Sequence, residues 1–185
     1  MNFRLLSHEV LYKGKVFDLE VDHIEYESGV KGVREVARHP GGAVTVPMFP
    51  DSTVLLVRQF RYPLQAYTLE VPAGKLNPGE DPEHAARREL EEETGWIAGK
   101  LGKLTSILTT PGFCTEVLHI YRATELVESP QGHRREEGER DMTVERIPLD
   151  RAIAMIGTQE ITDSKTIVGL LLAERSFNSR GNQGL

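Results

Sequence analysis

The chain has 185 residues, of which 39% are hydrophobic and 27% are charged, and its formal net charge is −6 at pH 7. This length and composition are typical of a soluble domain with a sizeable core, and the acidic balance argues against nucleic-acid binding through a general positive field. No apolar run approaches the roughly 18 residues of a membrane span, and the N-terminus lacks the apolar core of a signal peptide. The single cysteine, Cys114, cannot form an internal disulfide, which suits a reducing compartment. Together these features predict a cytoplasmic protein without membrane or nucleic-acid partners.

The first part of the chain is predicted to form strands. Apolar and polar residues alternate through residues 3–38, with a turn at 28–32, which indicates a small antiparallel sheet that needs a partner for its apolar face. Two apolar runs on either side of residues 50–52 are predicted to pair as a hairpin. Arg58 and Arg61 lie at the end of the second run, and each can donate two parallel hydrogen bonds to a phosphate.

A helix is predicted over residues 82–94. Asp81 is a suitable N-cap, Pro82 is favoured at the first helical position, and Gly95 is favoured just past the end. A strand and the turn residues at 77–79 precede this helix. The sequence therefore predicts a strand, a loop and a helix in succession.

Three carboxylates lie close together on this helix. Glu89 and Glu93 are one turn apart on a single face, and Glu92 lies on the other side of Glu89. Like charges at these spacings destabilise an isolated helix by roughly a few tenths of a kcal/mol per pair. A hard divalent cation would remove the conflict, whereas a solvated acidic face is the ordinary alternative.

The same stretch matches a long and specific sequence motif. The motif has a Gly, five residues, a Glu, seven residues, and then Arg-Glu-aliphatic-x-Glu-Glu-x-Gly followed by an apolar residue. The matching positions are Gly74, Glu80, Arg88, Glu89, Leu90, Glu92, Glu93, Gly95 and, as the apolar residue, Trp96. This pattern resembles the Nudix box, with a tryptophan where an aliphatic residue is usual.

The resemblance implies an α/β (α+β) fold, a Nudix-type α/β/α sandwich with a mixed sheet, plus a small N-terminal antiparallel β-sheet. It divides the chain into the N-terminal sheet at residues 1–39, a hydrolase domain at 40–178 and a tail at 179–185. In the enzymes that the chain resembles, the N-terminal sheet packs across a two-fold axis and completes the partner's active site. We therefore expect a homodimer.

The resemblance also implies metal-dependent hydrolysis of a pyrophosphate bond. Mg²⁺ or Mn²⁺ is the implied metal, and its implied ligands are Glu89, Glu92, Glu93 and the backbone carbonyl of Ala73. Arg88 is expected to orient the glutamates, and Glu80 to steady the loop, without touching substrate.

Residues 111–116, PGFCTE, narrow the expected substrate. Pro111 lies fifteen positions after Trp96, and the segment resembles the ADP-ribose pyrophosphatase branch, although an ordinary Pro-Gly turn is the alternative. The expected reaction converts ADP-ribose and water to AMP and ribose 5-phosphate, and related nucleoside diphosphate sugars are further expected substrates. The candidate substrate-binding residues are Arg61, which is preferred, Arg34, Glu116 and Arg58.

The polar segment 129–140 is expected to be a mobile loop. By the resemblance, this loop carries a catalytic glutamate that acts together with Glu93. The candidates are Glu139, which is preferred, Glu137 and Glu136. Two helices are predicted to follow, at 149–157 and 162–177, the second capped by Thr162 or Asp163 and packing through Ile167, Leu170 and Leu171.

Two other functions are weighed against the enzyme. A sensor would bind ADP-ribose or another nucleotide sugar without cleaving it and regulate transcription, and an acidic scaffold would bind no ligand. Sensors of this type usually lose box carboxylates and carry a DNA-binding helix pair, whereas Glu89, Glu92 and Glu93 are intact here and no basic helical extension is present. A scaffold would leave the whole motif unexplained.

Overall fold

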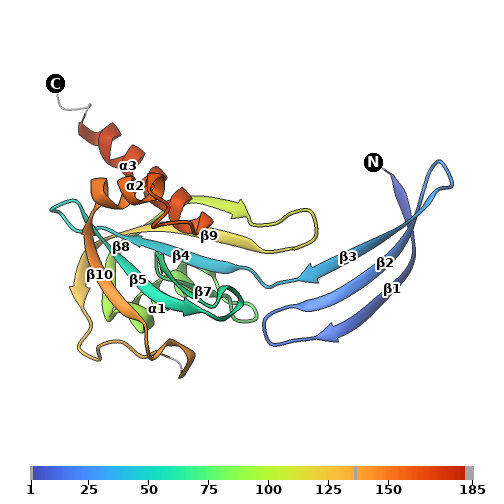
Figure 1. The fold of residues 1–185 in the computed structure, drawn as a ribbon, viewed down its shortest axis with the longest axis horizontal. Coiled ribbons are helices and arrows are strands. Elements are labelled where there is room, and N and C mark those ends of the chain that lie inside the picture. The colour runs from blue at the N-terminus through green and yellow to red at the C-terminus, as the bar shows by residue number, and fades with distance from the viewer. Residues whose placement is uncertain (1, 136, 182–185) are drawn as a thin grey trace. The chain divides into compact units, whose positions relative to one another are not determined.

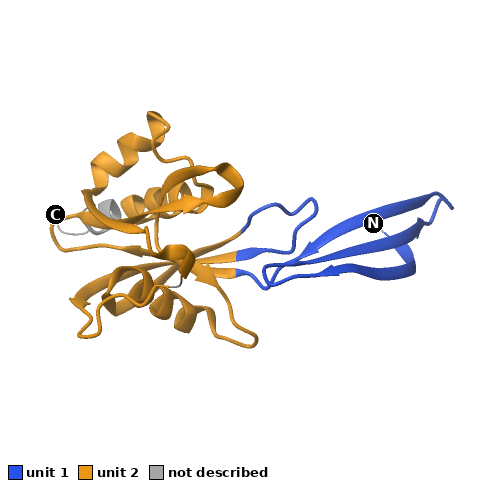
Figure 2. Ribbon diagram, turned by 60° about the horizontal axis from the view of Figure 1, so that its bottom comes forward, with its two compact units in different colours: residues 1–41, 108–117 blue, residues 42–107, 118–185 orange. Residues whose placement is uncertain are grey.

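The computed structural model of the chain describes residues 2–135 and 137–181. The chain divides into two compact units, residues 1–41 with 108–117 and residues 42–107 with 118–185 (Figure 2). Within the described ranges, no helix is both long and apolar enough to cross a lipid bilayer.

The first unit is built on an antiparallel sheet of three strands in the order β1-β2-β3 (Figure 1). The strands follow one another as predicted: β1 (Phe3–Lys13), β2 (Asp18–Tyr26) and β3 (Lys31–Arg38). The Ala37 N–H on β3 donates to the Phe113 carbonyl at 2.7 Å, which ties the 108–117 segment to the sheet. Ile24 is buried, whereas Phe3 and Tyr12 on β1 are each 58% exposed. Much of the apolar surface of this unit is therefore uncovered.

The second unit contains two sheets (Figure 1). A four-stranded mixed sheet has the order β7-β4-β9-β8, in which β4 is parallel to β9 and antiparallel to β7. A three-stranded antiparallel sheet has the order β10-β5-β6. The strands are β4 (Gly42–Pro47), β5 (Thr53–Arg61), β6 (Ala66–Glu70), β7 (Ala73–Lys75), β8 (Trp96–Leu108), β9 (Val117–Glu128) and β10 (Thr143–Pro148).

The predicted hairpin on either side of residues 50–52 forms only at its turn. Met48 and Val54 make an antiparallel bridge, and the Phe49 N–H donates to the Thr53 carbonyl at 2.9 Å. The predicted pairing of the two full strands is wrong, since β4 and β5 belong to different sheets. All six residues of β4 are buried, as expected for a strand that pairs in parallel and is covered on both faces. Apolar pattern alone does not distinguish such a strand from one arm of a hairpin.

Helices cover both faces of β4. The Thr45 hydroxyl donates to the Ala86 carbonyl of helix α1 (Pro82–Thr94) at 3.0 Å. Its neighbour Val46 faces the opposite way, because successive side chains of a strand alternate, and it packs in the core with Leu170 of helix α3 (Ser164–Gly181). A β-carbon added at Gly169 would lie 2.9 Å from Val46, so α3 approaches the sheet closely. The α/β/α sandwich with a mixed sheet is confirmed.

The helix ends follow the sequence signals. Asp81 caps α1 through its side chain, which accepts from the Glu83 N–H at 2.8 Å, and Gly95 ends the helix with φ of 76°. Helix α2 (Leu149–Gly157) has its predicted bounds. Asp163 precedes α3 and accepts from the Thr166 N–H at 2.9 Å, which makes it the cap.

Helix α3 differs from its prediction in two respects. It continues to Gly181, beyond the expected end at residue 177, and residues 182–185 of the expected tail lie outside the described residues. Leu171, expected on the packing face, is 44% exposed, whereas Leu170 is fully buried. Leu170 and Leu171 are about 100° apart around a helix, so both cannot lie at the centre of one narrow contact.

Replacing Asp81 with alanine should weaken the start of α1. The substitution removes the acceptor for the Glu83 N–H, and loss of such a cap costs about 1 kcal/mol in the free energy of unfolding. Urea unfolding of Asp81→Ala measures this change. Asp81→Ser, which keeps a capping oxygen, is the matched control, and equal stability of both variants would contradict the role of the cap.

Candidate active site

The loop between β7 and α1 brings the backbone against a carboxylate. A β-carbon at Gly74 would lie 2.0 Å from the Glu89 carboxyl group, so residue 74 has to be glycine if Glu89 keeps its place. Glu80 holds the loop, since its Oε2 accepts from the Asn77 N–H at 2.9 Å. These contacts explain two fixed positions of the motif.

Arg88 connects three carboxylates. It donates to Glu80 at 2.9 Å, to Glu89 at 2.6 Å and to Glu92 at 3.1 Å. The hydrogen bond to Arg88 lowers the pKa of Glu80 to about 2, and the same contacts raise the pKa of Arg88. Arg88 therefore orients the glutamates of the motif, as expected.

Glu93 is the buried carboxyl group of α1. Only 2% of the residue is exposed, and its Oε2 accepts from the Ala73 N–H at 3.1 Å. Burial raises the pKa of Glu93 well above its usual range, and the negative charges of Glu89 and Glu139 raise it further. Burial also raises the pKa of Glu89, against the opposing effect of Arg88. Burial therefore disfavours the charged forms of both carboxyl groups, and a nearby cation would favour them.

The segment after β9 is fastened to the C-terminal end of α1. The Ser129 N–H donates to the Gly95 carbonyl at 2.7 Å, and the Arg134 N–H donates to the Glu92 carbonyl at 2.8 Å. The Arg135 Nε donates to the Glu93 carbonyl at 2.9 Å, and its guanidinium also donates to the Met142 carbonyl. The loop expected to be mobile thus satisfies carbonyl groups that the helix leaves without partners.

A cavity of about 280 Å³ lies where this loop meets the motif. Its lining residues are Gly74, Lys75, Asn77, Arg88, Glu89, Glu92, Arg134 and Glu139. Of the three loop candidates, Glu139 lines the cavity, Glu137 pairs with Arg140 at 2.6 Å and is largely exposed, and Glu136 lies outside the described residues. Lys75, Asn77 and Arg134 were not among the predicted site residues.

The candidate substrate-binding residues are divided between the two units. On β5, Arg61 makes two hydrogen bonds to Glu70, and Arg58 pairs with Glu145 at 2.6 Å. In the first unit, Arg34 contacts the Tyr26 hydroxyl, and Glu116 lies 3.4 Å from the His39 ring. Each arginine therefore already has a partner within its own unit.

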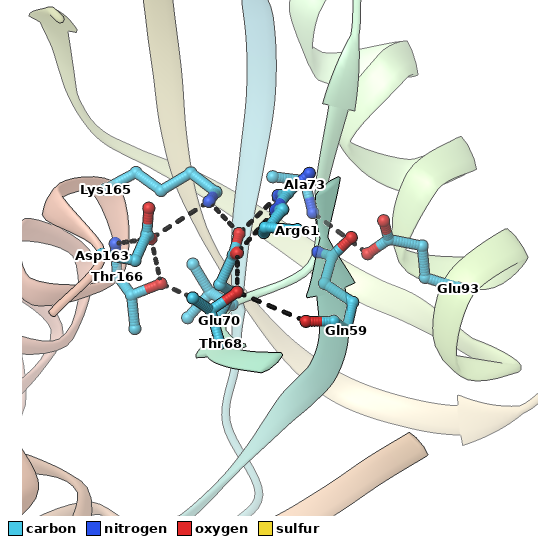
Figure 3. A network of polar contacts seen from close by, with 10 residues as sticks. Gln59, Arg61, Thr68, Glu70, Ala73, Glu93, Asp163, Lys165 and Thr166 are labelled. Atoms are coloured by element: carbon cyan, nitrogen blue, oxygen red, sulfur yellow. Dashed lines mark hydrogen bonds and ion pairs between the residues drawn. The ribbon is translucent and has the colours of Figure 1, made fainter. Parts of the chain in front are cut away.

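Glu70 is the centre of a polar network that the sequence did not predict (Figure 3). The residue is 2% exposed, and it accepts hydrogen bonds from Arg61, Thr68 and Lys165. Lys165 stands 95 positions later in the chain, and it follows a cap residue in an ordinary helix start. Nothing in the local pattern indicated this pairing.

The motif carboxylates have the right chemistry for a divalent cation. Carboxylate and carbonyl oxygens are the donors that Mg²⁺ and Mn²⁺ prefer, and burial raises the pKa values of both Glu89 and Glu93. As the side chains lie, the described residues contain no group of three or more His, Cys, Asp or Glu positioned to hold a metal. Glu89 and Glu92 are instead turned toward Arg88.

The chain belongs to the Nudix family, since the NUDIX domain model matches residues 39–168. It is 38% identical to the ADP-ribose pyrophosphatase of Bacillus subtilis over 163 residues, which cover 88% of each chain. It is 36% identical to the methanol dehydrogenase activator of Bacillus methanolicus, with 90% of each chain covered, and 35% identical to the GDP-mannose pyrophosphatase of Yersinia enterocolitica, with 85% and 84% covered.

The fold has a close match among solved structures. A crystal structure of an ADP compounds hydrolase matches 98% of this chain and 97% of its own, with a TM-score of 0.85 and 22% sequence identity. This match confirms the fold, and the relatives confirm the resemblance to the Nudix family and its ADP-ribose pyrophosphatase branch.

Glu70 should make the stability of the protein sensitive to acid. Burial raises its pKa, but Arg61 and Lys165 lower it by a larger amount, so that the pKa falls from 4.5 to about 2. Because the folded pKa lies below the unfolded one, the stabilisation is complete above pH 4.5 and is lost as pH falls toward 2. The loss is on the order of 3 kcal/mol. Urea unfolding across this range should show a shallower acid dependence for Glu70→Gln than for the wild type, and parallel curves would contradict it.

Proposed function

We propose that the chain hydrolyses the pyrophosphate bond of ADP-ribose to give AMP and ribose 5-phosphate, and that it accepts related nucleoside diphosphate sugars. The observation that carries this proposal is the cavity where Glu89, Glu92 and Glu139 gather beside the buried Glu93. Support for the substrate class comes from relatives named ADP-ribose and GDP-mannose pyrophosphatases.

Enzymes of this family need a divalent cation, and Mg²⁺ is proposed for this chain. Glu89, Glu92, Glu93 and the Ala73 carbonyl would hold it, once the first two carboxylates leave Arg88. When bound, the cation supplies neutralisation of the phosphate charge and activation of water. The Gly74 backbone keeps one wall of the site open, since a side chain there would displace Glu89.

Glu139 is the proposed general base. It lines the cavity with Glu89 and Glu92, whereas Glu137 is paired at the surface. A carboxylate in this place can take the proton from an attacking water. Its position is maintained by Arg135, which joins the Glu93 carbonyl of α1 to the Met142 carbonyl at the other end of the loop.

Arg61 is the proposed phosphate-binding residue, preferred over Arg58, and Arg34 and Glu116 are further proposed substrate-binding residues. The hydrogen bond to Glu70 is the main cause of the raised pKa of Arg61, and the charge of Glu93 adds to it, so Arg61 and Glu93 lie within electrostatic reach of each other. The Arg61 side chain is 40% exposed although its partner Glu70 is buried. A guanidinium that reaches solvent beside the carboxylate site can bind a substrate phosphate.

A homodimer in the cytoplasm is the proposed form of the protein. The domain limits proposed from the sequence, with a dimerising sheet at residues 1–39, are consistent with the exposed apolar residues of that sheet. These include Phe3, Leu5, Leu11, Tyr12 and Val33. Large exposed apolar side chains in such number are typical of a protein interface. The lone Cys114 suits a reducing compartment.

Glu93→Gln should reduce kcat for ADP-ribose by at least about a hundredfold, because it removes a negative charge required for the metal. Release of AMP, separated by chromatography in the presence of Mg²⁺, measures the effect, and excess chelator should abolish wild-type turnover. Glu128→Gln on the surface of β9 is the matched control. Hydrolysis preserved in Glu93→Gln would remove Glu93 from the metal site, and no wild-type hydrolysis of any nucleoside diphosphate sugar would favour a sensor.

Leu11→Lys should convert the dimer to a monomer. Leu11 is 55% exposed on β1, and a charge buried in an apolar interface has no compensating partner. Light scattering of the purified proteins measures the mass. Val127→Lys, at a residue of the second unit that is 56% exposed, should remain a dimer, and a wild-type mass of a single chain would refute the assignment.

A further inference from the structure

Glu70 is buried between two cations that come from different parts of the chain (Figure 3). Arg61 on β5 donates to its two carboxylate oxygens at 2.7 and 2.6 Å. Lys165 at the start of α3 donates to one of the same oxygens and is itself 8% exposed. Two cations thus share a single carboxylate.

Asp163 completes the network on the Lys165 side. Its carboxylate lies 3.0 Å from the Lys165 ammonium group and accepts from both the N–H and the hydroxyl of Thr166. Glu70 and Lys165 are the buried charged members of the network. The positive charge of Arg61 lies at the exposed end, because 40% of that side chain is accessible, compared with 10% for Lys165 and 20% for Asp163.

This distribution matters because an arginine beside uncompensated negative charge binds a phosphate poorly, since that charge repels the anion. Lys165 offsets part of the Glu70 charge and is itself paired with Asp163. The two cations and two carboxylates of the network are therefore formally neutral together. Removing Lys165 would leave a formal net charge of −1 on the three groups that remain, beside the guanidinium that has to bind the anion.

We propose that Lys165 is a positioning residue for substrate binding, which acts through Glu70 to offset the negative charge beside Arg61 and to keep the guanidinium oriented toward a phosphate of the substrate. The nature of that anion rests on the function proposed above. The charge-sharing role itself requires only that Arg61 binds a phosphate group. A purely structural Lys165 would instead stabilise α3 against β6 and would have no effect on anion binding in the folded protein.

Kinetics with ADP-ribose and Mg²⁺ test the proposal. Lys165→Met removes the charge and keeps most of the side-chain length, and it should raise KM about tenfold with kcat changed by less than about twofold, as expected for lost binding alone. Lys165→Arg should stay within about threefold of the wild-type KM. Lys100→Met is the matched control, since it makes the same change of charge at the exposed Lys100–Glu125 pair and should leave KM unaltered.

The double variant Glu70→Gln with Lys165→Met gives the sharpest result. It removes the carboxylate together with the lysine, so the network returns to a formal charge of zero and KM should return to within about threefold of the wild type. A double variant that binds more weakly than Lys165→Met alone would overturn the proposal, as would an unchanged KM in Lys165→Met. Should Lys165→Met lose its cooperative melting transition, Lys165→Gln replaces it with the same expectation.

Binding of inorganic pyrophosphate separates this proposal from the proposed function. Calorimetry on the full-length protein, with chelator present, should show weaker pyrophosphate binding in Lys165→Met and recovery in the double variant. This pattern together with no hydrolysis of ADP-ribose by the wild type would refute the proposed function and support the role of Lys165. Equal pyrophosphate binding by the wild type and Lys165→Met would refute that role.

Discussion

The close approach of the Gly74 backbone to the Glu89 carboxyl group is the constraint on which the rest of the site depends. A β-carbon at residue 74 would lie 2.0 Å from that carboxyl group, so a larger residue here would displace the Glu89 side chain from its position. Arg88 then has Glu80, Glu89 and Glu92 within hydrogen-bonding distance. Glu93, on the same helix, reaches the backbone one residue before the glycine.

Features that depend on neighbouring residues were predictable. The cap at Asp81, the glycine at the end of α1 and the spacing of the box carboxylates are encoded within a short stretch, because capping and helix geometry are local effects. Residues 3–38 likewise formed the expected antiparallel sheet. The box also located one wall of the cavity.

Features that depend on pairing between distant segments were not predictable. The sequence predicted that β4 pairs with β5, because two apolar runs stand on either side of a turn. In the structure β4 pairs in parallel with β9, more than seventy residues later in the chain. The partners of Glu70 come from β5 and from the start of α3. A single sequence gives no local sign of either contact, because an apolar run or a lysine near a helix start is compatible with many tertiary partners.

The chain passes from one sheet to the other through Val71 and Pro72, and hydrogen bonds hold this short link at both ends and in the middle. The Val71 N–H donates to the Thr166 hydroxyl, the Ala73 N–H donates to Glu93, and the Pro72 carbonyl accepts from the Thr45 N–H. Proline stands at the one position where the link needs no donor, since it has no N–H. Any other residue at 72 would bring a polar group into a buried crossing and would need an acceptor for it. Proline is therefore the residue best suited to this position, although Pro72 is not predicted to touch substrate or metal.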